Sequence, residues 1–187
     1  TGIDTRTLTR RLREHGTMKG WLVPAKDAAR GRNTAETVDM KEVFRLVERV
    51  RHTTATVLLT GERGTGKNLI ARLLHDQGPR AEGPFIAVNC AALPEPRLEA
   101  ELFGDERGTF TGATQRRLGR FELADGGTLL LDQIECLSLE MQAALLHVIE
   151  TGHVLRLNST YPILVNTRIM ATTAVNLESY VTDGRFL

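Results

Sequence analysis

The stretch VLLTGERGTGKNLIARLLH, residues 57–75, joins an apolar run to a helical pattern through a turn rich in glycine. This turn contains Gly61, Gly64 and Gly66, which lack the side chains that would keep a phosphate away from the backbone. Backbone N–H groups at the start of the following helix lie at the positive end of its dipole and can bind an anion. Lys67 adds a positive charge for the outer phosphates. The stretch therefore predicts a strand, a phosphate-binding turn and a helix in succession.

The spacing in this turn fits G-x-x-x-x-G-K, the pattern of phosphate-binding loops. Asn68 takes the position where the pattern has Ser or Thr, so the pattern is only partly met. A structural glycine turn is the alternative, but the preceding strand and the following helix favour nucleotide binding. The predicted nucleotide-binding residues are Gly61, Glu62, Arg63, Gly64, Thr65, Gly66, Lys67 and Asn68.

A second signal is GGTLLLDQI, residues 126–134, an apolar run that ends in Asp132. A carboxylate at the end of such a strand lies at the carboxyl edge of a parallel sheet, where ligands bind. In phosphoryl-transfer sites this aspartate holds Mg²⁺, directly or through water. A helix cap after the strand is the alternative reading. We therefore expect a nucleotide and Mg²⁺ as ligands, with Asp132 holding the metal.

The bulk composition indicates one ordinary globular domain. The chain has 187 residues, 25% of them charged, and a net charge of +1, so we expect no direct DNA binding by this segment. No apolar run is long enough to cross a bilayer and the first residues show no secretory pattern, which predicts a cytoplasmic protein without membrane contact. Its two cysteines are far apart and the histidines show no ligand spacing, so we expect no metal site built from side chains alone.

Three zones follow one another along the chain: a short basic segment (1–25), a polar linker (26–37) and a main domain (38–187). We predict strands at 55–60, 85–89, 128–131 and 168–172, and helices at 67–76, 96–103, 139–151 and 177–182. A further helix after Asp39 should bury Val43, Phe44, Val47 and Val50. Residues 153–165 are expected to form an inserted β-hairpin. The alternation predicts an α/β fold, a parallel sheet of about five strands with helices on both faces.

Five motifs of the main domain make a family resemblance specific: GERGTGKN, PFIAVNCAALPE, ELFGDERGTFTGA, GRFELADGGTLLLDQI and MQAALLHVIETG. In this order they resemble the sigma-54-dependent transcriptional activators of the AAA+ class, over residues 38–187. The resemblance implies a P-loop AAA+ fold, ATP and Mg²⁺ as cofactors, sigma-54 RNA polymerase as partner and assembly into a homo-oligomeric ring. The hairpin and following strand, LRLNSTYPILVNTRIMATT, look most like regulators of glycerol, dihydroxyacetone or acetoin operons, whose regulation through metabolic enzymes implies a possible regulatory protein partner.

The motif GTFTGA resembles the family's GAFTGA loop, which contacts sigma-54, with Thr109 in place of Ala. Glycines give such a loop backbone freedom and Phe110 an apolar tip, although alone it would read as a surface loop. The implied sigma-contact residues are Gly108, Thr109, Phe110, Thr111, Gly112 and Ala113. Asn89 matches the family residue that links nucleotide state to the catalytic carboxylate; a simple strand-ending amide is the alternative.

Several residues depart from the pattern of an active ATPase. Gln133 follows Asp132 where the resemblance implies Glu, and an amide cannot accept a proton from the attacking water. Ala174 stands where the family has a sensor Asn, and Asn68 replaces the family's usual Glu after the lysine. The chain ends at Leu187, before the arginine finger, helical lid and DNA-binding helices that the resemblance implies. We therefore expect an AAA+ domain that lacks its C-terminal lid.

The first 22 residues do not fit this family. They resemble a segment of the small subunit of carbamoyl-phosphate synthetase, from which no activity carries over, because its nucleophile lies elsewhere. A fusion, a wrongly assigned start and an artificial chain are all compatible with this join. The segment has the pattern of a basic amphipathic helix, and we expect its charged side chains to face solvent.

Three functions are compatible with the sequence. The first is an ATP-binding AAA+ domain of a sigma-54-type regulator in which Gln133, as a degenerate catalytic residue, impairs hydrolysis. A second is a working mechanochemical ATPase that remodels sigma-54 RNA polymerase. A third is a protein-interaction module that needs no nucleotide. Whether the chain is an enzyme therefore depends on the residues around Asp132 and Gln133.

Overall fold

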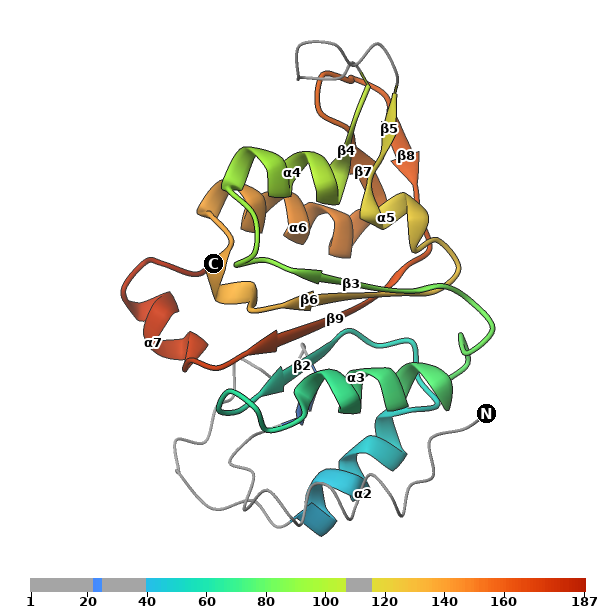
Figure 1. Cartoon of the computed structure of the whole chain (residues 1–187), viewed down its shortest axis with the longest axis vertical. Helices are drawn as coiled ribbons and strands as arrows, with labels where there is room; N and C mark the ends of the chain where they lie inside the picture. Colours follow the sequence, from blue (N-terminus) through green and yellow to red (C-terminus); the bar gives the residue numbers. More distant parts are fainter. Residues whose placement is uncertain (1–21, 25–39, 107–115) are drawn as a thin grey trace.

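A single sheet with helices on both faces forms the body of the molecule (Figure 1). The computed structural model describes residues 22–24, 40–106 and 116–187. On one face lie α2 (Met40–Val50) and α3 (Lys67–Asp76), and on the other α4 (Glu95–Phe103), α5 (Arg120–Leu123) and α6 (Leu139–Thr151). The α/β class predicted from the alternation of strands and helices is confirmed.

The sheet has the strand order β1-β2-β9-β6-β3. Its members are β1 (Leu22–Pro24), β2 (Val57–Thr60), β9 (Arg168–Thr173), β6 (Thr128–Asp132) and β3 (Phe85–Asn89). The last four run parallel, and β1 pairs antiparallel with β2. The predicted sheet of about five strands is thus confirmed, with the four predicted strands parallel and a fifth, antiparallel strand that comes from the zone assigned to the basic N-terminal segment. A three-residue strand is too short to show a period in the sequence.

The parallel strands are buried on both faces, which follows from their sequence. In β6, Leu129 and Leu131 join the hydrophobic cluster under α4 and α6, whereas Leu130 joins the cluster under α2 and α3. Successive side chains of a strand point to opposite faces, so an unbroken apolar run fills two cores. Each such leucine contributes about 1.5–3 kcal/mol when buried.

The predicted element bounds agree closely with the structure. The strand 85–89 and the helices 67–76, 139–151 and 177–182 have the predicted bounds. Strand β2 begins at Val57, two residues later than predicted, and the carbonyl of Ala55 accepts a hydrogen bond from the buried Arg168 instead. Strands β6 and β9 each extend one residue further, because Asp132 pairs with Asn89 and Thr173 with Thr60.

Two small hairpins project from one end of the sheet (Figure 1). The predicted hairpin is confirmed: β7 (His153–Leu155) pairs antiparallel with β8 (Pro162–Leu164). A second, unpredicted pair joins β4 (Gly104–Asp105) to β5 (Arg117–Leu118). It brings together the two ends of the segment that carries GTFTGA. Residues 108–113 themselves lie outside the described residues.

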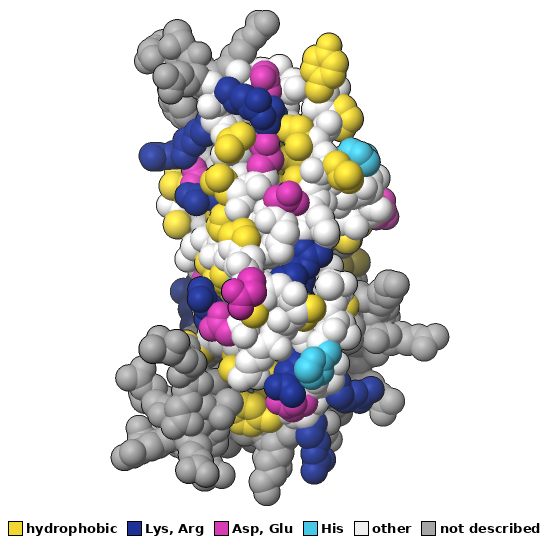
Figure 2. All heavy atoms as spheres, turned by 90° about the vertical axis from the view of Figure 1, so that its right-hand side faces the viewer, with side chains coloured by type: hydrophobic (Ala, Val, Ile, Leu, Met, Phe, Trp, Pro, Cys, Tyr) yellow, Lys and Arg dark blue, Asp and Glu magenta, His cyan; other side chains and the backbone are white. Residues whose placement is uncertain are grey.

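Helix α7 (Leu177–Thr182) follows β9, and its amide cap Asn176 accepts a hydrogen bond from the backbone of Glu178 at 2.9 Å. Within the described ranges, none of the helices has the length and apolarity required to span a membrane. The face seen in Figure 2 carries acidic and basic side chains interspersed, in keeping with the net charge of +1.

Candidate nucleotide site

The turn between β2 and α3 has the backbone that its glycines predict. Gly64 and Gly66 have φ angles of 79° and 85°, in the left-handed region that glycine adopts without steric cost. Gly66 is the residue that precedes the first turn of α3, and this first turn contains no acidic side chain. The start of α3 therefore presents free N–H groups and its positive dipole end without a competing carboxylate on the helix.

Lys67 lies folded over this turn. Its Nζ donates hydrogen bonds to the carbonyl oxygens of Gly61 at 2.7 Å and Glu62 at 2.8 Å. Burial lowers the pKa of Lys67, and the negative charges of Asp132 and Glu135 oppose this shift. The ammonium group is thus held among acceptors that a phosphate could replace.

Asp132 ends β6 at the carboxyl edge of the sheet and is fixed by side chains from two other elements. Its Oδ1 accepts a hydrogen bond from Thr172 of β9, and its Oδ2 accepts one from Asn68 Nδ2 at 3.4 Å. Thr172 is fully buried, so its hydroxyl has no competing water. The role of Thr172 could not be predicted from the sequence, because Thr172 and Asp132 are 40 residues apart and meet only where β9 lies beside β6.

Gln133 takes a backbone conformation that few residues other than glycine adopt. Its φ and ψ angles are 60° and 57°, and its backbone N–H donates to Thr172 Oγ1 at 3.2 Å. The side-chain Nε2 donates to Asn89 Oδ1 at 3.2 Å, an oxygen that also accepts the backbone N–H of Ala91 at 2.8 Å. Asn89 and Gln133 therefore form one amide pair across β3 and β6. Strained residues of this kind cluster at functional sites.

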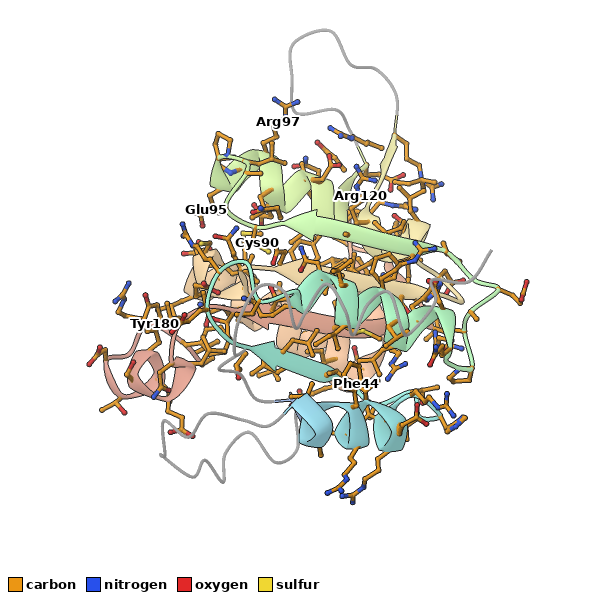
Figure 3. All side chains as sticks on the ribbon, turned by 60° about the horizontal axis from the view of Figure 1, so that its bottom comes forward. Phe44, Cys90, Glu95, Arg97, Arg120 and Tyr180 are labelled. Atoms are coloured by element: carbon orange, nitrogen blue, oxygen red, sulfur yellow. The ribbon has the colours of Figure 1, made fainter. Side chains whose placement is uncertain are left out.

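These residues surround one cavity of about 390 Å³. It is lined by Arg63, Gly64, Gly66, Lys67, Asn68, Leu69, Asp132, Gln133 and Ala174. Most of the predicted nucleotide residues therefore meet at one place, together with Leu69 and Ala174. Gly61, Glu62 and Thr65 complete the turn but do not line the cavity, and Asn89 reaches it only through Gln133. Figure 3 shows Cys90, the residue after β3, at the same edge of the sheet as the turn.

The donor set at the cavity suits Mg²⁺ bound mainly through its nucleotide. Magnesium prefers oxygen ligands and in such sites takes one or two carboxylates, with phosphates and water completing the shell. Asp132 offers the carboxylate, and the side-chain amide nitrogen of Asn68 donates a hydrogen bond to it. In the part of the chain that the structure describes, no group of three or more His, Cys, Asp or Glu side chains could hold a metal without such help.

Glu135 is a carboxylate beside the cavity-lining residue Ala174 that the sequence motifs did not single out. It lies in the short 3₁₀ helix η2 (Ile134–Cys136) directly after β6. Its Oε1 accepts a hydrogen bond from the backbone N–H of Ala174 at 3.4 Å. Its Oε2 is buried without a hydrogen-bond partner, the one such side-chain atom among the described residues. An acidic residue two positions after Gln133 was the available signal in the sequence.

Neither cysteine is prepared for nucleophilic chemistry. Burial, followed by the neighbouring charges of Cys136, Asp132 and Glu135, raises the pKa of Cys90 to about 12. Burial also raises the pKa of Cys136. Both thiols therefore stay protonated near neutral pH, and only a thiolate is an effective nucleophile.

A buried ion-pair network lies at the base of the segment 107–115. Arg156, 6% exposed, follows β7 and donates to Glu106 at 2.7 Å and to Glu122 at 2.8 Å. Glu106 is the last described residue before the segment, and Arg116, 3.9 Å from Glu122, is the first after it. The network thus ties both ends of the segment to the inserted hairpin and to α5.

Known proteins resemble this chain over most of its length. Residues 34–187 match the family described as the sigma-54 interaction domain. The DNA-binding transcriptional regulator NtrC of Escherichia coli K12 is 49% identical over 147 residues, which cover 79% of this chain and 31% of NtrC. The Nif-specific regulatory protein of Rhodobacter capsulatus is 54% identical over 145 residues, covering 78% of this chain and 25% of that protein. The chain therefore spans about a third or less of the curated relatives it matches.

A solved structure agrees with these matches. NtrX from Brucella abortus, in complex with ATP, superposes with a TM-score of 0.70 at 34% identity, covering 98% of this chain and 39% of that one. These matches do not support the narrower resemblance to regulators of glycerol, dihydroxyacetone or acetoin operons, which stays a prediction. They also do not support the resemblance of residues 1–22 to carbamoyl-phosphate synthetase, which likewise stays a prediction. The family itself is shown: this chain belongs to the sigma-54 interaction domains of AAA+ transcriptional activators.

Proposed function

We propose that this domain binds ATP with Mg²⁺ at the cavity between the glycine turn and Asp132, and uses the bound nucleotide to control contact with sigma-54 RNA polymerase. The observation that carries the proposal is the convergence of Lys67, Asp132 and the start of α3 on one cavity. A cation, a carboxylate and free helix N–H groups together match the parts of a nucleoside triphosphate with its metal. The ATP complex of the related NtrX supports the same choice of ligand.

Each residue has a definite role in this proposal. Lys67 exchanges its bonds to Gly61 and Glu62 for bonds to the outer phosphates. Asp132, held by Thr172 and Asn68, is the residue that would hold Mg²⁺, and the metal supplies charge neutralisation on the phosphates. The Asn89–Gln133 amide pair connects this site to β3, from which the chain continues to α4 and the GTFTGA segment.

Hydrolysis at this site is expected to be slow. Gln133 can orient a water but cannot accept its proton, and a general base contributes about 10²–10⁴-fold to such a step. Replacing Gln133 by Glu supplies a carboxylate at the same place, so turnover of Gln133→Glu should rise by about that factor. Phosphate release measured at several protein concentrations checks this, and an unchanged rate in Gln133→Glu would mean that the missing base does not limit turnover.

The link between nucleotide and partner is tested with purified sigma-54. Binding of sigma-54 should require a nonhydrolysable ATP analogue with Mg²⁺ and should be lost in Lys67→Ala, because that variant lacks the cation for the phosphates. Equal binding by the parent protein and Lys67→Ala in the absence of nucleotide would instead support a nucleotide-independent interaction module. We also propose that the domain assembles into rings and that a regulatory protein partner controls it. Sedimentation of the same samples measures the size of the assemblies that form.

A further inference from the structure

We propose that the side chain of Arg63 binds the outer phosphate of a nucleotide held by its own chain, and so raises the affinity of the site for ATP relative to ADP. The proposal rests on the proposed function, since it requires a nucleotide in the cavity. Its basis is the place of Arg63 in the cavity wall, together with a guanidinium group that has no hydrogen bond or ion pair to any residue that the structure describes.

The charges on the cavity wall favour an anion. Among the described residues that line the cavity, Arg63 and Lys67 are the cations and Asp132 is the one carboxylate. Burial lowers the pKa of Lys67, and the positive charge of Arg63 adds to this shift. Two like charges beside one cavity repel each other, and a bound polyanion would relieve that repulsion.

The two cations differ in what already holds them. Lys67 donates to the carbonyl oxygens of Gly61 and Glu62, so it must exchange these bonds when a phosphate binds. Arg63 is exposed, and its N–H donors meet no acceptor among the described residues. An exposed arginine elsewhere on the surface is simply solvated, but Arg63 lies on the wall of the cavity. Its guanidinium can therefore bind a phosphate without first breaking a bond to the protein.

Arg63 is placed toward the outer phosphates. Burial raises the pKa of Cys136, and the positive charge of Arg63 opposes this shift. Arg63 is thus within electrostatic reach of Lys67 and of the 3₁₀ helix that directly follows Asp132 and Gln133. Magnesium bridges the β- and γ-phosphates in sites of this kind, so the phosphates next to Asp132 are the outer ones.

A guanidinium at this place distinguishes the two nucleotides by charge. It stays protonated at all relevant pH values, and its planar fork of N–H donors matches the oxygens of a phosphate. ADP lacks the γ-phosphate, so it loses this contact while it keeps the contacts of the glycine turn to the inner phosphates. Because the arginine belongs to the same chain as the turn, the preference should not depend on protein concentration.

Competition titrations measure the preference. A fluorescent ADP analogue is bound in the presence of Mg²⁺, and unlabelled ADP or a nonhydrolysable ATP analogue displaces it. In Arg63→Gln, the dissociation constant for the ATP analogue should rise about 10-fold, the lower end for a charge-assisted hydrogen bond, since Arg63 is exposed. The dissociation constant for ADP should change by less than about 3-fold.

Matched variants separate this contact from general effects of charge. Arg63→Lys keeps the positive charge, so its affinity for the ATP analogue should stay within about 3-fold of the parent. Arg97→Gln removes an exposed arginine of α4 that does not line the cavity (Figure 3), so both dissociation constants should stay unchanged. Added salt should shrink the difference between the parent and Arg63→Gln, because it screens an exposed charge. Equal urea midpoints show that each variant is folded.

The other outcomes overturn the proposal. An equal loss of affinity for both nucleotides in Arg63→Gln would place the guanidinium away from the outer phosphate, and no loss would leave it solvated. A loss in Arg63→Lys as large as in Arg63→Gln would show that the charge does not select ATP. Each of these results would refute the role of Arg63 while the proposed function stands. Absence of ATP and ADP binding by the folded parent would refute both.

Discussion

Replacing Arg156 by Met is expected to destabilise the domain strongly and to reverse the effect of acid on its stability. Arg156 is 6% exposed and bridges Glu122, whose side chain is 11% exposed, and Glu106, at 38%. Burial by itself would raise the pKa of Glu122, but hydrogen bonds from Arg156 and the backbone of Gly119 hold it below its usual range. Without the guanidinium, Glu122 keeps only the Gly119 N–H and the exposed Arg116 at 3.9 Å, so we expect burial to dominate.

The burial of Glu122 sets how much unfolding free energy Arg156→Met should lose. Removing one partner of a buried ion pair costs about 3–5 kcal/mol, because the remaining charge stays desolvated. Glu106 is half-exposed and can turn to water, so the cost comes from Glu122 and we expect about 2–4 kcal/mol at pH 7. In the parent, the lowered pKa of Glu122 gives stability that is present above pH 4.5 and is lost as the pH falls through the folded-state pKa. In Arg156→Met, the raised pKa gives the opposite sign, so part of the loss is recovered on acidification from pH 7 to pH 5.

Urea unfolding at pH 7 and pH 5 measures both effects. Arg117→Met is the matched control, because Arg117 pairs with Glu101 but is 52% exposed, and its loss should cost less than about 1 kcal/mol. The double variant Arg156→Met/Glu122→Gln should recover at least half of the loss at pH 7, since it removes the stranded charge. A loss of less than about 1 kcal/mol in Arg156→Met, or the same loss at both pH values, would refute the reasoning.

Two further predictions concern buried groups near the sheet. Thr172→Val keeps the shape of the side chain but removes the hydroxyl that binds Asp132 and accepts the Gln133 N–H, so the affinity for Mg-ATP should fall about 10-fold; an unchanged dissociation constant in a nucleotide titration would show that Asp132 needs no such support. Burial lowers the pKa of His75, whose Nδ1 lies 3.0 Å from Thr128 Oγ1. Its folded-state pKa is below the unfolded value, so stability that is present above pH 6.5 should be lost as the pH falls through the folded-state pKa, and His75→Gln should remove this dependence. Urea midpoints from pH 8 to pH 5 check this, and an equally steep fall in His75→Gln would assign the dependence to other groups.

The sequence was sufficient for features that arise from local pattern. The run from β2 to α3 has an apolar strand, three glycines, a lysine and an amphipathic helix at fixed spacing, and the structure contains them in this order, with only the start of the strand shifted by two residues. The same holds for β6 and for the edge of the sheet at which Asp132 lies. These features follow from periodicity and from the geometry of parallel strands.

Other features depend on contacts between distant residues and left no local pattern. Thr172 meets Asp132 only because β9 inserts between β2 and β6. Strand β1 is defined by its pairing with β2, and the network of Arg156 joins three elements that are separate in the chain. Glu135 was visible as an acidic residue, but its unpartnered buried oxygen emerges only from the packing around η2.

The central claim, that the glycine turn and Asp132 form a nucleotide site, is tested most directly by titrating the folded chain with a fluorescent ATP analogue in Mg²⁺. The account predicts saturable binding that unlabelled ATP displaces. In Lys67→Ala, the affinity should fall at least about 10-fold, because a charge-assisted hydrogen bond contributes about 1.5–3 kcal/mol. Circular dichroism of the same samples shows that the variant is folded. No saturable binding by the folded parent, or equal affinity in Lys67→Ala, would contradict the account.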